Sequence, residues 1–379
     1  MSIDHCLQSF RRRPQLALRI QLLSLAAVLL CAPSVAPHTP SQDQNHSAAF
    51  YSRLYRSNVS CPDRSNWMRD SSWIQNRSLY AITLPGTHDS GAYVLYDSYL
   101  KGYTADWIEA AMELAQLLHI DLYDVVKMWA LAQAQSPLGS VAGQLRAGAR
   151  YIDLRCSWNG TAWVTFHFEQ GVLCRVLMQD ISDFLSAFTS EIVYVEFGVE
   201  SSPEHDEPSR SIMALLYDDM RDTLLPFHIP THSDLRSLTV AQLVASNARC
   251  LIASPHRPFE FEGKVFLAQN IIHNTYANSD LLQDMEAYNL RRVAEFRSWN
   301  RSALFKMSWT LTTGPRAVIE SILPGQPRSL RELSQAAFEA TMSWARANAA
   351  EKYPRFGQIF ISDFFCESSV FEASMPDIV

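Results

Sequence analysis

Five residues whose side chains could transfer protons or bind phosphate each follow a short apolar run: His88, Asp89, Arg155, His167 and Asp363. Histidine and carboxylate groups exchange protons near neutral pH, and an arginine fork binds phosphate oxygens through parallel hydrogen bonds. Two histidines, acids that orient them and one arginine suit metal-free cleavage of a phosphodiester. One imidazole would take a proton from an attacking hydroxyl, and the other would protonate the leaving oxygen.

The stretch LPGTHDSGAY (84–93) follows an apolar run that predicts a short buried strand ended by Pro85 and Gly86. His88 and Asp89 then lie on the loop after this strand, where an α/β barrel carries its active-site residues. The alternative is an ordinary turn in which Asp89 caps a helix and His88 has no role. Suitable partners for His88 elsewhere in the chain favour the active-site interpretation.

Strand and helix patterns alternate along the rest of the chain. Strands are predicted at 150–156, 163–168, 191–198, 250–253, 265–268, 303–311 and 358–363, with a polar loop at 269–280. Helices are predicted at 106–135, 140–149, 176–188, 209–225, 238–245, 281–299 and 329–350. The broad apolar face of the first helix indicates core packing, with a lid or a lipid-touching surface as the alternative. Together the elements predict a (β/α) TIM-type barrel whose strand ends converge on one face.

Composition and charge limit the partners and the compartment. The 379 residues suit one barrel-sized domain, and the net charge of -7 gives no reason to expect nucleic acid as a partner. Nothing in the sequence indicates an obligate protein partner. Three arginines precede an apolar run at 20–32, which predicts a signal peptide over 1–36, or an uncleaved anchor. Residues 37–60 are expected to be a linker, and 61–379 the catalytic domain.

Cysteines and glycosylation triplets agree with the secretory route. Two of the seven cysteines lie in the targeting segment, so the other five allow at most two disulfides, with Cys156 and Cys174 a plausible pair. N-x-Ser/Thr triplets follow the apolar run at Asn45, Asn58, Asn76, Asn159 and Asn300. The sequence therefore predicts a secreted or lumenal glycoprotein, which residues 20–32 would tether if they are not removed.

Several motifs resemble the X domain of phosphatidylinositol-specific phospholipase C in its single-domain form. In the order of that family they are LPGTHDSGAY (84–93), QLRAGARYIDLR (144–155), the strand with His167, SEIVYVEFG (190–198), SWTLT (308–312) and ISDFF (361–365). The resemblance implies an irregular (β/α)8 TIM-type barrel that forms a single catalytic domain. It also implies a phosphodiesterase acting at a membrane surface on phosphatidylinositol or a glycosyl-phosphatidylinositol. Its products would be diacylglycerol and an inositol cyclic phosphate.

The resemblance also implies a role for each catalytic residue. His88 would be the general base, oriented by Asp363, and His167 the general acid, with Asp89 as its partner. Arg155 would hold the phosphate. Calcium-dependent members carry an acidic ligand at the position of Arg155, so the resemblance implies no calcium and no other cofactor. One departure is that FEQG follows His167, where many relatives have Gly directly.

Glu196, Arg257 and Tyr276 are the candidate substrate-binding residues, with solvated loop residues as the alternative for the last two. Asp153 and Glu196 match positions where family members carry metal-site acids, but we expect both to be charge partners of Arg155.

Two other functions fit parts of the pattern. A related barrel phosphodiesterase could need a divalent metal and act on glycerophosphodiesters or sphingolipid, but Arg155 argues against it. A non-catalytic barrel could bind inositol lipid without turnover, but the presence of both His88 and His167 argues against it.

Overall fold

A computed structural model describes residues 61–95, 139–167, 169–199, 209–230, 234–254, 265–267, 271–298, 303–314, 317–318, 327, 329–348, 354 and 357–375. The predicted signal segment, linker and helix at 106–135 lie outside the described residues. Within them, ten strands form one sheet, and eight of these are parallel in the order β7-β6-β5-β2-β1-β10-β9-β8. The parallel strands are β1 (Leu84–Thr87), β2 (Tyr151–Trp158), β5 (Val193–Val199), β6 (Cys250–Ser254), β7 (Phe266–Leu267), β8 (Ile272–Thr275), β9 (Leu304–Trp309) and β10 (Ile359–Ser362).

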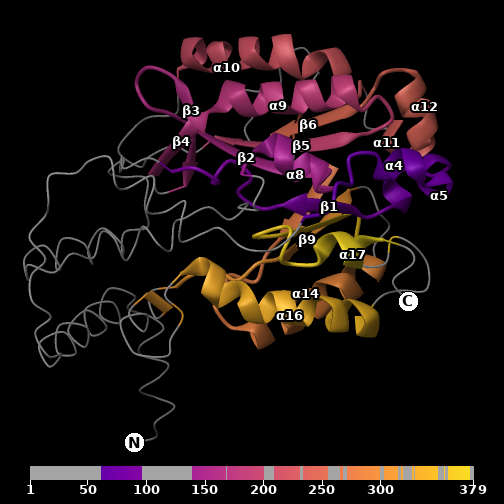
Figure 1. The fold of residues 1–379 in the computed structure, drawn as a ribbon, viewed down its shortest axis with the longest axis vertical. Coiled ribbons are helices and arrows are strands. Elements are labelled where there is room, and N and C mark those ends of the chain that lie inside the picture. Colours follow the sequence, from indigo (N-terminus) through magenta and orange to yellow (C-terminus); the bar gives the residue numbers. More distant parts are fainter. Residues whose placement is uncertain are drawn as a thin grey trace, which may run out of the picture.

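Helices cover the sheet on two sides, as Figure 1 shows, with α9 and α10 on one side and α14 and α16 on the other. The longer helices are α9 (Cys174–Ala187), α10 (Arg210–Thr223), α14 (Leu282–Ser298) and α16 (Leu330–Asn348). The shorter ones are α4 (Trp67–Asp70), α5 (Ser72–Gln75), α8 (Val141–Arg146), α11 (Asp234–Ser237), α12 (Val240–Ala245) and α17 (Val370–Ser374). Single 3-10 turns lie at Leu79–Ala81 and Leu225–Phe227. Most connections therefore follow the predicted strand-helix alternation.

The alternation of side chains along β2 divides the core into two parts. Ile152 and Leu154 belong to the large apolar cluster that includes α8 and α9. Tyr151 belongs instead to a second cluster with residues of β1, β5, β6, β8, β9 and β10. Because successive side chains of a strand point to opposite faces, Asp153 and Arg155 share the inner face with Tyr151. The same residues that build the core thus direct the polar ones into the barrel.

Three predicted elements differ from the structure. The apolar lead-in at Leu79 forms a 3-10 turn, and β1 begins later, so Pro85 and Gly86 lie within the strand instead of ending it. Gly86 is required there because a Cβ atom would lie 2.7 Å from Cβ of Tyr151. The predicted loop at 269–280 contains β8, and the strand with His167 is no barrel strand but part of an antiparallel hairpin. That hairpin pairs β3 (Trp163–His167) with β4 (Glu169–Leu173) and with the far end of β2.

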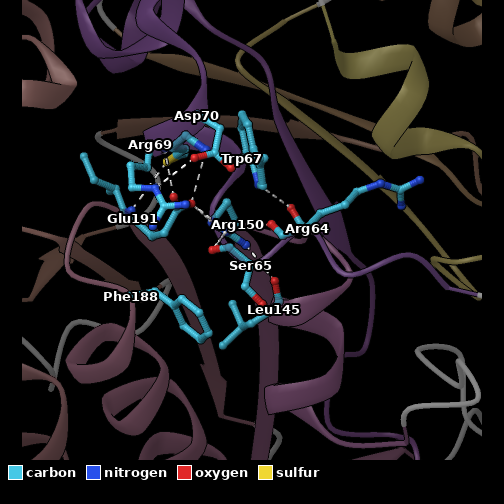
Figure 2. A network of polar contacts seen from close by, with 12 residues as sticks. Arg64, Ser65, Trp67, Arg69, Asp70, Leu145, Arg150, Phe188 and Glu191 are labelled. Carbon is cyan, nitrogen blue, oxygen red and sulfur yellow. Dashed lines mark hydrogen bonds and ion pairs between the residues drawn. The ribbon is translucent and has the colours of Figure 1, made fainter.

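Two disulfides and a fully buried ion pair connect segments of the described chain. Cys156 bonds Cys174 as predicted, and Cys61 bonds Cys366. Arg150 and Glu191, at the start of β2 and β5, form a fully buried ion pair that also contacts the segment around α4 (Figure 2). Across the described residues no helix combines the length and apolar character that a membrane span requires.

Candidate active site

Strand register brings the predicted residues into one layer. Thr87 of β1 pairs with Ser362 of β10, so His88 and Asp363, the next residues of each strand, lie side by side at the carboxyl ends. On the other side of β1, Thr87 pairs with Ile152, which puts Asp153 level with His88. Because parallel strands present their carboxyl ends on one edge, the barrel gathers these side chains around a single opening.

His88 is held at both ring nitrogens. Its Nδ1 lies 2.8 Å from Oδ1 of Asp363, and its Nε2 lies 2.9 Å from Nη2 of Arg155. A guanidinium can only donate, so this contact requires a lone pair on Nε2 and puts the proton of the neutral ring on Nδ1, toward Asp363. The arrangement is the one that a general base needs before it takes a proton at Nε2.

The electrostatic surroundings favour the uptake of that proton. Burial disfavours the charged imidazole, but the carboxylates of Asp89 and Asp363 outweigh burial and raise the pKa of His88 to about 9. Burial also disfavours the charge of Asp153, yet the cations Arg155 and Lys306 hold its pKa well below the usual range. The site is thus built from charges that compensate one another, and a proton gained by His88 is stabilised.

Asp89 connects the two histidines. Its Oδ2 lies 3.9 Å from Nδ1 of His88 and 3.2 Å from Nε2 of His167, which ends β3. The backbone of Asp89 has a φ of 42°, in the left-handed region that Asp tolerates, and its N–H donates to Oδ2 of Asp153 at 3.2 Å. This tight turn directs the Asp89 carboxylate, 2% exposed, between the two partly exposed imidazoles.

Arg155 fills the place that a cation would take. His88, Asp89 and Asp153 offer atoms within 4.8 Å of one another, as a metal site would. Arg155 contacts all three: Nε lies 2.5 Å from Oδ1 of Asp89, and Nη2 lies 3.1 Å from Oδ2 of Asp153. A divalent ion would have to displace the guanidinium, since two cations repel at such distances. The donor set therefore fits Arg155 better than a metal.

The predicted substrate-binding residues have different surroundings. Glu196 pairs in register with Asp153, but its carboxylate contacts Tyr151 and Lys306, so the prediction that it partners Arg155 is wrong, whereas Asp153 does so as predicted. Tyr276 directly follows β8 at the carboxyl edge and is 53% exposed. Arg257 lies outside the described residues.

Sequence reasoning missed several residues that support the site. Gln144 of α8 donates from Nε2 to the carbonyl of Ser90 at 2.9 Å, and Oγ of Ser90 accepts from the N–H of Asp153 at 2.9 Å. Lys306, in the middle of β9, is 4% exposed. Lys306 is the charged residue in the apolar run LFKMSW. Because lysine is seldom buried without a partner, this position was a signal that an acidic partner lies inside the barrel.

Comparisons with known proteins give one sequence relative and several structural neighbours. No protein-family model matches the sequence. A variant-surface-glycoprotein phospholipase C of Trypanosoma cruzi is 24% identical over 181 residues, which cover 46% of each chain. The chain thus matches about half the length of this curated relative.

Solved structures cover more of the chain. The phosphatidylinositol-specific phospholipase C of Listeria monocytogenes superimposes with a TM-score of 0.53 and 18% identity, over 83% of this chain and all (100%) of the other. The enzyme of the same name from S. aureus gives a TM-score of 0.54 and 14% identity, over 83% of this chain and 98% of the other. The fold is therefore the TIM-type barrel of these phospholipases. The trypanosomal relative is likewise named a phospholipase C.

Proposed function

We propose that this chain is a phosphodiesterase that cleaves phosphatidylinositol, or a glycosyl-phosphatidylinositol, into diacylglycerol and an inositol cyclic phosphate without a metal ion. The observation that carries the proposal is that His88 and His167 approach the same oxygen of Asp89, while Arg155 lies against His88. One phosphate group bound to Arg155 would then lie between a base and an acid. The names of the bacterial and trypanosomal relatives support the same substrate class.

The first step is an attack within the substrate. His88 accepts the proton of the inositol 2-hydroxyl at Nε2, and the hydroxyl oxygen bonds to its own phosphorus. Asp363 fixes the ring and stabilises the imidazolium that results. Because nucleophile and phosphate belong to one molecule, the enzyme does not have to bring them together, which removes much of the entropic barrier.

The second group completes the exchange. As the bond between phosphorus and the glycerol oxygen breaks, His167 donates a proton to that oxygen, and Asp89, 3.2 Å from Nε2, holds the ring in place. Arg155 moves from His88 to the phosphoryl oxygens and neutralises their growing charge. One proton is taken and one is given, so diacylglycerol leaves neutral and the cyclic phosphate keeps its single negative charge.

Glu196 is the first candidate for contacts with the head group. Both of its hydrogen bonds within the described residues use Oε2, at 2.6 Å to the hydroxyl of Tyr151 and 3.0 Å to Nζ of Lys306. Within the described part of the chain Oε1 makes no hydrogen bond, so it can accept one from an inositol hydroxyl. Tyr276 would offer an exposed aromatic face from the rim, and Arg257 a further cation.

The proposed substrate lies in a membrane, and the chain would act there from the secreted or lumenal side. Two disulfides, Cys61–Cys366 and Cys156–Cys174, suit an oxidising compartment, and Cys250 is buried and unpaired within the described residues. Asn76 is exposed and is available for a glycan. Release of residues 1–36, a linker at 37–60 and a barrel from residue 61 are part of this proposal. Mass spectrometry of the purified secreted chain would identify its first residue and its glycans.

Phosphorus NMR of products tests the reaction directly. The chain is incubated with phosphatidylinositol vesicles and a chelator, and a cyclic phosphate signal is expected together with diacylglycerol. His88→Ala and His167→Ala serve as inactive controls. Absence of the cyclic phosphate in the wild type, or an equal rate with His88→Ala, would overturn the proposal.

A further inference from the structure

A charged group lies buried below the layer of His88, Asp153 and Asp363. Nζ of Lys306 lies 2.8 Å from the hydroxyl of Tyr151 and 3.0 Å from Oε2 of Glu196, and the lysine side chain is 4% exposed. The Tyr151 hydroxyl also donates to the same Oε2 at 2.6 Å. The three polar ends therefore form a closed triangle, in which Oε2 accepts twice and the ammonium donates twice.

The triangle connects opposite walls of the barrel. In the sheet order, β9 with Lys306 is separated from β2 by β1 and β10, and from β5 by β2 as well. Tyr151 and Glu196 come from β2 and β5. The contact therefore crosses the barrel interior. Within the described residues β7 and β8 are not paired with each other, so the contact joins two walls that no hydrogen-bonded ladder closes there.

The charges explain why a cation is needed at this depth. Glu196 is the direct neighbour of Asp153 in the register of β2 and β5, so two carboxylates lie on adjacent strands of one inner face. Arg155 compensates the charge of Asp153, whereas Glu196 bonds to Tyr151 and Lys306 and not to Arg155. An isolated buried carboxylate is costly, and Lys306 is the cation that pairs with Glu196.

We propose that Lys306, together with Tyr151, is a positioning residue that fixes Glu196 so that its Oε1 faces the opening and receives a hydroxyl of the substrate head group. The inference rests on the proposed function for the identity of that head group. Lys306 itself does not touch the substrate. It acts through Glu196, and the two residues should behave as one unit in kinetics and in folding.

A double-mutant cycle in kinetics tests this unit. Lys306→Met and Glu196→Gln should each lower kcat/KM for phosphatidylinositol about 10- to 100-fold, mostly through a higher KM, because a binding contact is lost and the bases are intact. The double variant should be no worse than the poorer single variant. Effects that multiply, or a Lys306→Met variant with wild-type KM, would overturn the inference. Arg221→Met, which removes an exposed cation on α10, is the matched control and should leave KM unchanged.

A second cycle does not depend on turnover. Urea unfolding of the same four proteins should give a coupling of at least about fivefold in the unfolding equilibrium constant between Lys306 and Glu196. An inactive wild type with this coupling would contradict the proposed function and leave the fixing of Glu196 supported. Additive effects would overturn the fixing of Glu196 even in an active enzyme.

Folding of the single variant provides a further check. If Lys306→Met does not fold, the double variant, which removes both charges, should regain folding. Loss of folding in both variants would mean that Lys306 acts independently of Glu196, which overturns the inference.

Discussion

Two arginines form ion pairs at opposite ends of the same barrel: Arg150, which directly precedes β2, and Arg155, which lies within it. At the amino end, Arg150 pairs with Glu191, and both side chains are 0% exposed. At the carboxyl end, Arg155 pairs with Asp89 and Asp153 but keeps 30% exposure. The chemistry of the two pairs is the same, guanidinium against carboxylate, so their difference lies in what else each guanidinium contacts.

Arg150 is surrounded by fixed acceptors. Its guanidinium donates to Glu191 and to the carbonyls of Leu145, Ala149 and Ser65, at 2.8 to 2.9 Å for the carbonyls (Figure 2). Glu191 in turn accepts from the N–H of Arg69 at 3.0 Å. Full satisfaction of a buried charge holds the N-terminal segment against β2 and leaves no donor for a ligand.

Arg155 instead bonds to groups that can change partners. Within the described residues it contacts two acids that also serve the histidines, and it contacts His88, whose lone pair is available only in the neutral ring. A phosphate that enters the opening competes for the same guanidinium. The comparison teaches that enclosure makes an ion pair structural, whereas partial exposure and exchangeable partners make it available for chemistry.

The largest effect is expected when His88, the proposed base in the network around Arg155, is removed. His88→Ala should lower kcat about 10³- to 10⁴-fold, because general base catalysis is lost. Phosphatidylinositol turnover measures it, with circular dichroism to verify folding. His228→Ala is the matched control, since the His228 ring, within the described residues, bonds a backbone carbonyl and no catalytic candidate. Equal rates for the two alanine variants would show that the carboxyl-end network is not catalytic.

Loss of the buried Arg150–Glu191 pair should instead lower the stability of the fold. Arg150→Met leaves Glu191 buried and uncompensated, so the free energy of unfolding should fall by about 3 to 5 kcal/mol, as for other broken buried ion pairs. Urea denaturation measures the loss, and kcat of the folded protein should not change. The double variant Arg150→Met, Glu191→Leu should regain most of the stability. A kcat that falls while stability stays unchanged would reverse the roles assigned to the two ends.

Asp363→Asn sharpens the assignment of His88. The carboxylate of Asp363 helps to raise the pKa of His88 to about 9, and the neutral amide of asparagine removes that contribution. Because the base must be unprotonated, kcat/KM rises with pH through the pKa of His88, and this limb should move to lower pH in the variant. The rate itself should fall about 100-fold as the ring loses its orientation. A limb at the wild-type position would mean that another group controls it.

A smaller effect is expected in the pH dependence of stability. The folded pKa of His88, about 9, exceeds the usual value of 6.5, so folding gains from its protonation. That gain is complete below pH 6.5 and is lost as pH rises toward 9. Urea titrations should therefore show stability decreasing over this range by roughly 1 to 3 kcal/mol, and the slope should be weaker in His88→Ala. Equal slopes would argue against the raised pKa.

The sequence predicted the candidate site residues at the carboxyl end better than the residues that support them. His88, Asp363 and Arg155 each follow or end an apolar run, and the strand period alone assigns Asp153 and Arg155 to one face. The prediction for Glu196 was half right, because period and position put it in the layer, whereas its partner comes from β9, which no local pattern connects with β5.

The predicted boundaries failed where tertiary contacts override local preference. Pro and Gly normally end strands, but Gly86 continues β1 because Tyr151 leaves no room for a side chain. Strand β8 was missed because it is short, carries polar residues and pairs, within the described residues, with β9 alone. Its edge position removes the apolar run that a central parallel strand would show.

The smallest effect is expected from removal of divalent ions. Addition of a chelator should change the rate of phosphatidylinositol cleavage less than about twofold, because Arg155 contacts each of the three groups that could hold a cation, and a second cation would repel it. The measurement is the initial rate with chelator, then with added calcium or magnesium. Arg155→Met supplies the contrast, since without the guanidinium the acids Asp89 and Asp153 would be free to bind an added ion. A wild-type rate that falls with chelator and returns with calcium would mean that His88, Asp89 and Asp153 hold a metal ion, and that Arg155 does not replace a cation there.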